Sequence, residues 1–361
     1  MTQVTTHGPH ERATAPVMAD VARLAGVSHQ TVSRVLNLHP NVAPQTRERV
    51  EIAIAQLGYR RNTAARALAT RSTCTLGVIS VETSQYGPSS TLFAIEGAAR
   101  AGGYFINLVS LRQVDRRHMR EAVDHLMGAG VEGLVAISPL RSAVEALRGL
   151  SIDVPLVEVE ATDLAAETGV VVDQHAGARA ATRHLLALGH QTVVHVAGPD
   201  GWLEAQARMR GWQSALLDAG REVRDVLAGD WTARSGYAAG RELAGPVARG
   251  EVSAIFVAND QMALGLLRAL AEAGLGAPDD VSVVGFDDIP EAAFYPPPLT
   301  TLRQDFGEVG RRCIELLMAR IEGRPAVARP AIRPQLLVRA STGPPAGAPR
   351  PGGASGATPG P

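Results

Sequence analysis

From residue 74 onward, short apolar segments alternate with amphipathic ones, and this alternation constrains the fold more than any other feature of the sequence. The amphipathic segments, such as 176–188 and 261–273, carry apolar residues at helical spacing. Strands separated by helices pair in parallel, and helices cover both faces of the sheet. The sequence therefore predicts a doubly wound α/β architecture. The strand candidates are residues 75–81, 104–109, 133–137, 156–159, 192–196, 254–257 and 281–284.

This α/β part, residues 74–340, is long for one domain, so we expect two lobes with a ligand cleft between them. Lobe one is expected to hold residues 74–160 and 305–323, and lobe two residues 161–303 and 330–340. The helix up to Ile321 and a strand over 332–338 complete the lobes. Residues 1–15 lack periodicity, and residues 341–361 are rich in Gly and Pro, so both ends are expected to be disordered.

The N-terminal part, residues 16–61, predicts three short helices. The first starts near Met18 and stops at Gly26, a residue that tolerates left-handed geometry. Ser28 is a good N-cap for a second helix over 29–36, and Pro44 suits the first turn of a third helix that ends at Gly58. The residues expected to face inward from the second and third helices are Val32, Val35, Leu36, Val50, Ile54 and Leu57.

The formal net charge of −1 conceals an uneven distribution of charge. Residues 1–72 hold nine arginines against four acidic residues, a net +5, which indicates a polyanion partner for this part alone. No run is apolar enough for a membrane span or a secretory signal, so we expect a cytoplasmic protein. The two cysteines, Cys74 and Cys313, are too few for a disulfide framework or a structural zinc site. We expect small core residues there, no metal and no cofactor.

The second helix places four polar side chains on one face, and these are the candidates for reading bases. Glutamine can pair with adenine and arginine with guanine in the major groove of DNA. The pattern alone leaves open that this is only a solvated polar face. The four residues are His29, Gln30, Ser33 and Arg34.

The run from Asp20 to Asn37 closely resembles the headpiece signature of the lactose-repressor (LacI/GalR) family, and the likeness continues through 46–50, 57–59, Asn62 and 65–69. The resemblance implies a helix-turn-helix headpiece on a periplasmic-binding-protein-like sensor domain. It adds Ser28, Thr31 and Asn37 to the DNA contacts.

In that family a hinge helix, here within 62–73, forms on the operator and inserts a leucine into the minor groove. The resemblance assigns Asn62, Ala65 and Leu68 to this hinge; the alternative for Leu68 is a linker residue packed on the core. Val17 stands where the family usually has a capping threonine, so the start of the first helix is expected to fray, because a lost cap typically costs about 1 kcal/mol.

The resemblance extends to about Ala340, is strongest to the family's lactose-responsive members, and implies a sugar pocket. Arg208, Asn259 and Asp287 would bind hydroxyls, while Trp231 and Phe306 would pack on the sugar ring. The alternatives are that Asn259 and Asp287 cap helices and that Trp231 belongs to the core.

Other pocket positions follow from the same likeness. Pro88 lies where the family encloses the ligand's tail. Arg141 and Glu158 depart from the family's pocket, which has an aspartate and a phenylalanine there. They would neutralise each other across the cleft, or Arg141 would face an acidic or phosphorylated ligand.

These expectations together describe a homodimeric repressor that binds a pseudo-palindromic operator of double-stranded DNA and is then located at the nucleoid. A sugar is expected to release it from the DNA, and a galactoside is the leading candidate. The alternative effector is a purine or phosphorylated corepressor. A dimer is expected because a Gly/Pro tail replaces the family's tetramer-forming helix.

An enzyme is disfavoured because P-loop, G-x-G-x-x-G and G-x-S-x-G motifs are lacking and His184, His190 and His195 do not have metal-site spacing. The DNA-binding headpiece argues against a second alternative, a periplasmic protein that captures sugars.

Overall fold

The computed structural model describes residues 16–37, 39–60, 72–81, 84–159, 169–325, 327 and 329–346. The chain divides into two compact units, residues 1–73 and 74–361, each described below by itself. The expected lead-in, the hinge residues Asn62, Ala65 and Leu68, and the tail from 347 lie outside the described residues.

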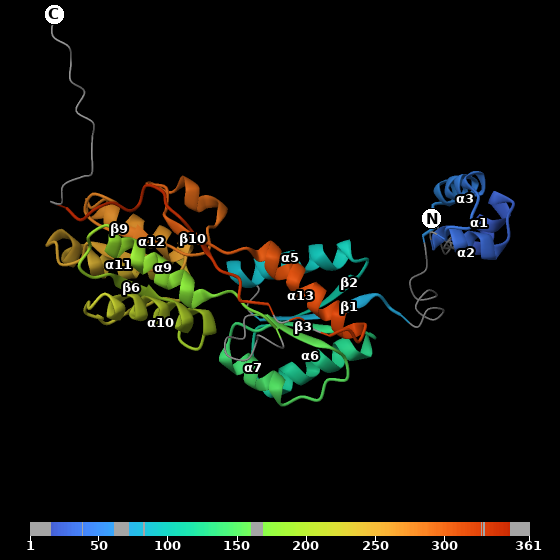
Figure 1. The fold of residues 1–361 in the computed structure, drawn as a ribbon, viewed down its shortest axis with the longest axis horizontal. Coiled ribbons are helices and arrows are strands. Elements are labelled where there is room, and N and C mark those ends of the chain that lie inside the picture. Colours follow the sequence, from blue (N-terminus) through green and yellow to red (C-terminus); the bar gives the residue numbers. More distant parts are fainter. Residues whose placement is uncertain are drawn as a thin grey trace, which may run out of the picture. The chain divides into compact units, whose positions relative to one another are not determined.

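In its described residues, the smaller unit contains three helices that pack around one small core: α1 (Met18–Ala25), α2 (His29–Leu36) and α3 (Pro44–Leu57) (Figure 1). Gly26 and Gly58 end α1 and α3 with φ angles of 63° and 60°, a left-handed conformation that glycine adopts without strain. Of the six residues expected to face inward, Val32, Val35 and Val50 are buried, whereas Leu36, Ile54 and Leu57 pack at the edge of the core.

In the larger unit, lobe one is built on a parallel five-stranded sheet in the order β2-β1-β3-β4-β5. Helices α5 (Tyr86–Ala101) and α13 (Phe306–Ile321) cover one face, and α6 (Arg116–Gly128) and α7 (Arg141–Arg148) cover the other (Figure 1). Cys313 is fully buried in the first of these cores, as expected, whereas Cys74 is half-buried. The strands are β1 (Thr75–Val81), β2 (Phe105–Leu111), β3 (Leu134–Ile137), β4 (Leu156–Val159) and β5 (Gly169–Val170).

Lobe two is built on a parallel four-stranded sheet in the order β7-β6-β8-β9. Helices α11 and α12 cover one face, and α9 and α10 cover the other. The predicted doubly wound architecture with two parallel sheets is therefore confirmed. The elements are α9 (Gln174–Ala187), β6 (Val194–Ala197), α10 (Leu203–Asp218), β7 (Leu227–Ala228), α11 (Ala233–Ala248), β8 (Ala254–Val257), α12 (Asp260–Glu272), β9 (Ser282–Val284) and the 3-10 turn η1 (Pro290–Phe294).

The boundaries between the lobes differ from those expected. Strand β5 pairs with β4, so the first passage out of lobe one lies after Val170 rather than at residue 161. The strand expected over 332–338 is only β11 (Gln335–Leu337), which pairs antiparallel with β10 (Thr301–Arg303). Ile332 instead bridges to Val172, because two passages between the lobes run side by side there.

The sequence predicts a disordered tail from residue 341, and this start is too early. Ser341 is fully buried, and its hydroxyl donates to the carbonyl of Val283 and accepts from the backbone N–H of Thr300. The carbonyl of Gly343 accepts a hydrogen bond from the hydroxyl of Ser282. Residues 341–343 thus belong to lobe two, because β9 needs a neighbour on its free edge.

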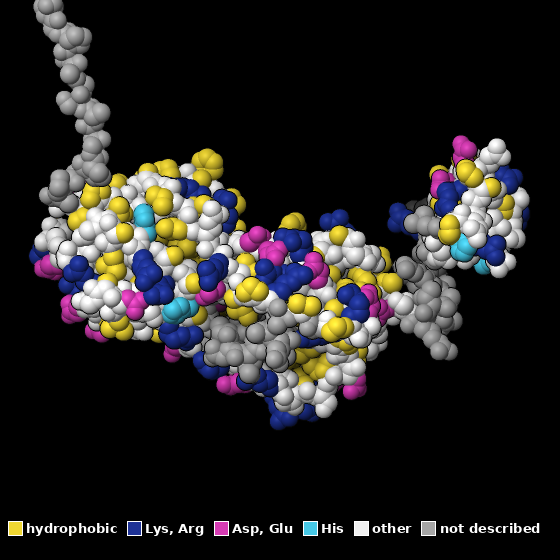
Figure 2. Space-filling model, viewed as in Figure 1, with side chains coloured by type: hydrophobic (Ala, Val, Ile, Leu, Met, Phe, Trp, Pro, Cys, Tyr) yellow, Lys and Arg dark blue, Asp and Glu magenta, His cyan; other side chains and the backbone are white. Residues whose placement is uncertain are grey.

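Acidic and basic side chains are interspersed over the face of the larger unit in view in Figure 2. Within the described residues, no helix combines the length and the apolar character needed to cross a bilayer.

Candidate functional site

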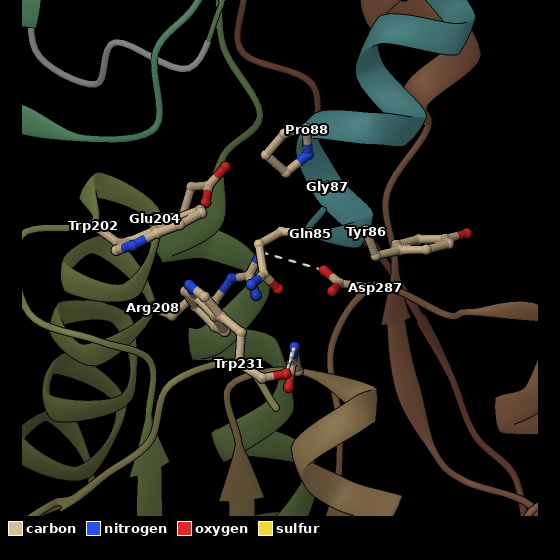
Figure 3. Close-up of a pocket in the computed structure, with 10 residues that line it drawn as sticks. Gln85, Tyr86, Gly87, Pro88, Trp202, Glu204, Arg208, Trp231 and Asp287 are labelled. Atoms are coloured by element: carbon tan, nitrogen blue, oxygen red, sulfur yellow. Dashed lines mark hydrogen bonds and ion pairs between the residues drawn. The ribbon is translucent and has the colours of Figure 1, made fainter. Parts of the chain in front are cut away.

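A pocket of about 290 Å³ lies where the first turn of α5 in lobe one faces lobe two (Figure 3). This volume includes space that is open to solvent. Five of the eight expected effector residues line it: Pro88, Arg208, Trp231, Asn259 and Asp287. The expectation did not include the other five lining residues, Gln85, Tyr86, Gly87, Trp202 and Glu204.

Arg208 is the centre of the pocket's polar side and is only 3% exposed. From helix α10, its Nε donates to Oε1 of Gln174 at 2.9 Å, its Nη1 donates to the carbonyl of Ala258, and its Nη2 lies 3.4 Å from Oδ1 of Asp287. Gln174 in turn donates to Gln304, and Gln304 donates to the same oxygen of Asp287 at 2.7 Å. Arg208, Gln174, Gln304 and Asp287 therefore form a closed, buried ring of hydrogen bonds, which we call the polar ring.

Asp287 follows β9 in a left-handed conformation, with φ 108°, which turns its side chain into the polar ring. Burial raises the pKa of its carboxyl group to about 6, although the charge of Arg208 opposes this shift. The negative charge of Glu204 also raises this pKa, so the two carboxylates sense each other across the pocket. No helix begins at Asp287, so the alternative that it is a helix cap does not apply.

Trp231 and Trp202 supply the apolar surface of the pocket. Their rings meet edge to face with centroids 5.5 Å apart, and the guanidinium carbon of Arg208 lies 5.5 Å from the centroid of Trp231. Trp231 packs directly on Gly198, where an added Cβ would lie 2.2 Å from the indole ring. The residue thus both packs in the core and lines the pocket, so the two readings of Trp231 are compatible.

Asn259 lines the pocket but is also a helix cap, which was the alternative considered for it. Its side-chain oxygen accepts from the backbone N–H of Met262 at 2.9 Å, and its amide nitrogen donates to the carbonyl of Trp231. The residue therefore fixes the start of α12 and the position of Trp231 at the same time.

Three expected pocket residues lie elsewhere. Phe306 packs its ring on Tyr86 with centroids 5.8 Å apart, so it contacts a pocket residue without lining the pocket itself. Arg141 is exposed and donates to Gln206 at 2.9 Å. Glu158 is half-buried in β4, where desolvation raises its pKa against the charges of Arg148 and Arg320.

The expectation that Arg141 and Glu158 neutralise each other across the cleft is therefore wrong. Arg141 begins α7 and Glu158 lies within β4, and the two side chains have different partners.

For two of the pocket residues that the sequence analysis missed, Glu204 and Trp202, the sequence did contain a signal. Glu204 precedes Arg208 by four residues, which places both on the same face of α10. Trp202 is the N-cap residue of that helix. Gln85 and Tyr86 carried no comparable signal, because only tertiary packing brings the start of α5 against lobe two.

The three histidines have different hydrogen-bond and ring partners, although the charge of His184 contributes to lowering the pKa of His190. His184 contacts Thr342, His190 contacts the hydroxyls of Ser253 and Ser282, and His195 stacks on Phe256 with centroids 4.7 Å apart. Burial lowers the pKa of His195 to about 4. No group that could hold a metal ion occurs within the described part of the chain.

In the headpiece, α2 keeps the expected polar face open. His29, Gln30 and Arg34 are exposed, and Ser33 is partly exposed. Ser28 caps the helix as predicted by accepting from the backbone N–H of Thr31 at 3.1 Å. Asn37, just after the helix, is exposed and contacts Ser33.

Two family models match this chain. The model described as bacterial regulatory proteins, lacI family, matches residues 17–62, and a periplasmic binding protein-like domain matches residues 182–342. The lactose operon repressor of Escherichia coli (strain K12) is 35% identical over 326 residues, which cover 90% of this chain and 89% of that repressor. The chain belongs to the LacI family. It is accordingly a DNA-binding repressor with a small-molecule effector domain, in a family that is not enzymatic.

Solved structures agree with this assignment. A lac repressor dimer bound to operator and the anti-inducer ONPF superposes with a TM-score of 0.79 at 33% identity, covering 91% of this chain and all of that one. A complex of the transcriptional regulator CelR with cellobiose has a TM-score of 0.66 at 32% identity, covering 90% of this chain and 99% of that one. The family assignment thus holds for both the sequence and the fold.

Proposed function

We propose that this LacI-family repressor controls genes of sugar utilisation and leaves its operator when a sugar binds between its lobes. The observation that carries the proposal is the combination of a hydrogen-bonded Arg208–Asp287 pair with two tryptophan rings around one pocket. Hydroxyl groups satisfy both donors and acceptors, and the C–H faces of a sugar ring pack on indole. A galactoside or related glycoside is the leading effector, since the relatives above include a lactose operon repressor and a complex with cellobiose.

The proposed DNA-bound form is a homodimer on a pseudo-palindromic operator. The polar face of α2 would enter the major groove, with Gln30 and Arg34 at the base edges. Leu68 and its neighbours would act in the minor groove, as the family resemblance implies. The lac repressor dimer bound to operator supports this arrangement by its similarity.

A purine or phosphorylated corepressor is the second candidate. An anion would need a surplus of positive charge in the pocket, but the arginine that lines it, Arg208, is already paired with Asp287, and Glu204 adds a further carboxylate to the lining. The pocket geometry therefore favours a neutral sugar over a phosphorylated ligand.

The test is a mobility-shift titration of the full chain on DNA from its own upstream region. Lactose, cellobiose, galactose and ribose are added separately to the preformed complex. Release by one of these sugars is expected. DNA binding that appears only after a ligand is added would instead identify a corepressor, and insensitivity to every sugar, with release by a purine, would refute the sugar effector.

A further inference from the structure

One carboxylate in the pocket has no partner within the described residues. Glu204 is 6% exposed, yet neither a hydrogen bond nor an ion pair reaches its side chain. A buried charge without a partner destabilises a fold unless something compensates it. Glu204 nevertheless lines the pocket rather than the closed core, so a ligand can reach it.

The neighbouring charges do not compensate Glu204. Arg208, the cation of the pocket, is held in the polar ring and is paired with Asp287. Asp287 carries a negative charge of its own once ionised. The pocket therefore has one more acid than base, and the excess acid is Glu204.

Across the pocket from Glu204 lies the first turn of α5. Figure 3 shows the carboxylate of Glu204 on the side of Pro88, away from the Arg208–Asp287 contact. The first N–H groups of a helix have no partner within the helix, and Gln85 provides no side-chain cap for α5. Pro88 has no N–H group, so the donors of this turn are the N–H groups of Tyr86 and Gly87, which line the same pocket as Glu204. A hydroxyl group is suited to such a place, because it donates to the carboxylate and accepts from an N–H group.

We propose that Glu204 is a specificity-determining residue that binds a hydroxyl edge of the effector opposite the start of α5, and thereby selects uncharged polyols over phosphorylated or carboxylated ones. This rests on the proposed sugar-binding function. It explains why an unpaired carboxylate is kept in a buried place: the ligand supplies its hydrogen bonds. It also links the two lobes through the ligand, since Glu204 and α5 belong to different lobes.

The experiment measures thermal unfolding of the full chain for the wild type, Glu204→Gln and the control Glu242→Gln. Glu242 lies exposed on α11, so its substitution removes the same charge away from the pocket. Without sugar, Glu204→Gln is expected to raise Tm by about 2 °C or more, because it removes an uncompensated charge, while the control leaves Tm unchanged. A fall in the Tm of Glu204→Gln would show a structural role and overturn the proposal.

The second arm uses neutral and anionic probes in pairs: glucose with glucose 6-phosphate, galactose with galacturonate, and also lactose and cellobiose. The neutral sugar that stabilises the wild type is expected to bind Glu204→Gln at least about tenfold more weakly, while its anionic counterpart does not bind the wild type. Unchanged affinity in the variant, or a wild-type preference for the anion, would overturn the proposal. If no sugar raises the Tm of the wild type, the proposal of a sugar effector is refuted. The comparison of Tm values without sugar then decides alone whether Glu204 has a structural role.

Discussion

At the scale of single residues, the pocket shows how a buried charge is made tolerable. Three of the five N–H groups of Arg208 donate to two neutral partners and one carboxylate, and the guanidinium carbon lies 3.8 Å from the ring centroid of Phe286. Arginine suits this place because its planar group donates in several fixed directions and stacks on aromatic rings. The consequence is a rigid polar wall whose charge depends on the protonation of Asp287.

Replacing Asp287 by asparagine should change how stability depends on pH. The pKa of Asp287 is about 6 in the folded chain against an ordinary value of 3.8, so the folded state binds this proton more tightly than the unfolded state. As the pH falls from 8 to 5, the wild type should therefore gain about 1.4 kcal/mol of stability relative to Asp287→Asn, and about 3 kcal/mol once the pH is below both pKa values. Urea unfolding at several pH values measures this. A difference that stays constant with pH would contradict the assigned shift.

Gly198→Ala tests whether the close packing of Trp231 on residue 198 is needed for sugar binding. The added Cβ would lie 2.2 Å from a rigid indole ring, so Trp231 must move. We expect sugar affinity to fall by about tenfold or more and stability by about 1–3 kcal/mol, the usual effect of overpacking. Tryptophan fluorescence and calorimetric titration report the two effects. Gly201→Ala is not a suitable control because of its positive φ; Gly97→Ala, which meets open space in the interior of α5, is suitable.

At the scale of elements, the headpiece helices depend on caps more than on length. Val17 cannot cap α1 with its side chain, as expected, but its backbone N–H donates to the carboxylate of Asp20 at 3.0 Å. This is the reverse half of a capping box, and it supports the first turn that the sequence suggested would fray. Helix α2 has a full cap from Ser28, which leaves its polar face well placed for contact.

The exposed face of α2 should be needed for operator binding. Arg34→Ala removes the arginine at the C-terminal end of that face, and a lost base contact typically weakens specific binding by about 1–3 kcal/mol. The control is Arg23→Ala on α1, whose side chain is 78% exposed and pairs with Asp20. Mobility shifts of both variants on the same DNA are compared. Equal loss in both would indicate a general effect of charge rather than recognition by α2.

At the scale of the whole sensor unit, the polar ring lies on the passages between the lobes. Gln174 begins α9 just after the chain leaves β5, and Gln304 lies between β10 and α13, where the chain returns to lobe one. Both are buried, and together they join Arg208 to Asp287. A ligand that contacts the Arg208–Asp287 pair is therefore connected, through Gln174 and Gln304, to two of the segments that join the lobes. These segments must bend when the angle between the lobes changes.

Gln304→Met should uncouple sugar binding from DNA release. The variant keeps the volume of the side chain but removes the hydrogen bonds to Gln174 and Asp287. We expect the sugar concentration needed for release to rise more than the sugar's Kd, with a stability loss of about 1–3 kcal/mol. Titration of sugar binding and of release on the same preparation separates the two quantities. Gln335→Met, at an exposed position of β11, is the matched control.

Local patterns in the sequence were enough to determine the elements and the class of fold. The bounds of α2, β1, β4 and β8 follow from apolar spacing and caps, because these depend on neighbouring residues. The likeness in single residues also placed Arg208, Asp287, Trp231, Asn259 and Pro88 at one site. Each of these positions carries a chemically distinctive side chain next to a strand or helix end.

Tertiary structure alone decided which groups meet. Arg141 and Glu158 carried the same kind of sequence signal as the true pocket residues, yet Arg141 donates to Gln206 on α10 of lobe two and Glu158 faces Arg148 and Arg320 of lobe one. Glu204 became a site residue only because α10 and the start of α5 face each other across the lobes. Burial, and not residue type, turns such a carboxylate into a binding group, since the free energy of an unpaired charge depends on how much water and how many partners surround it.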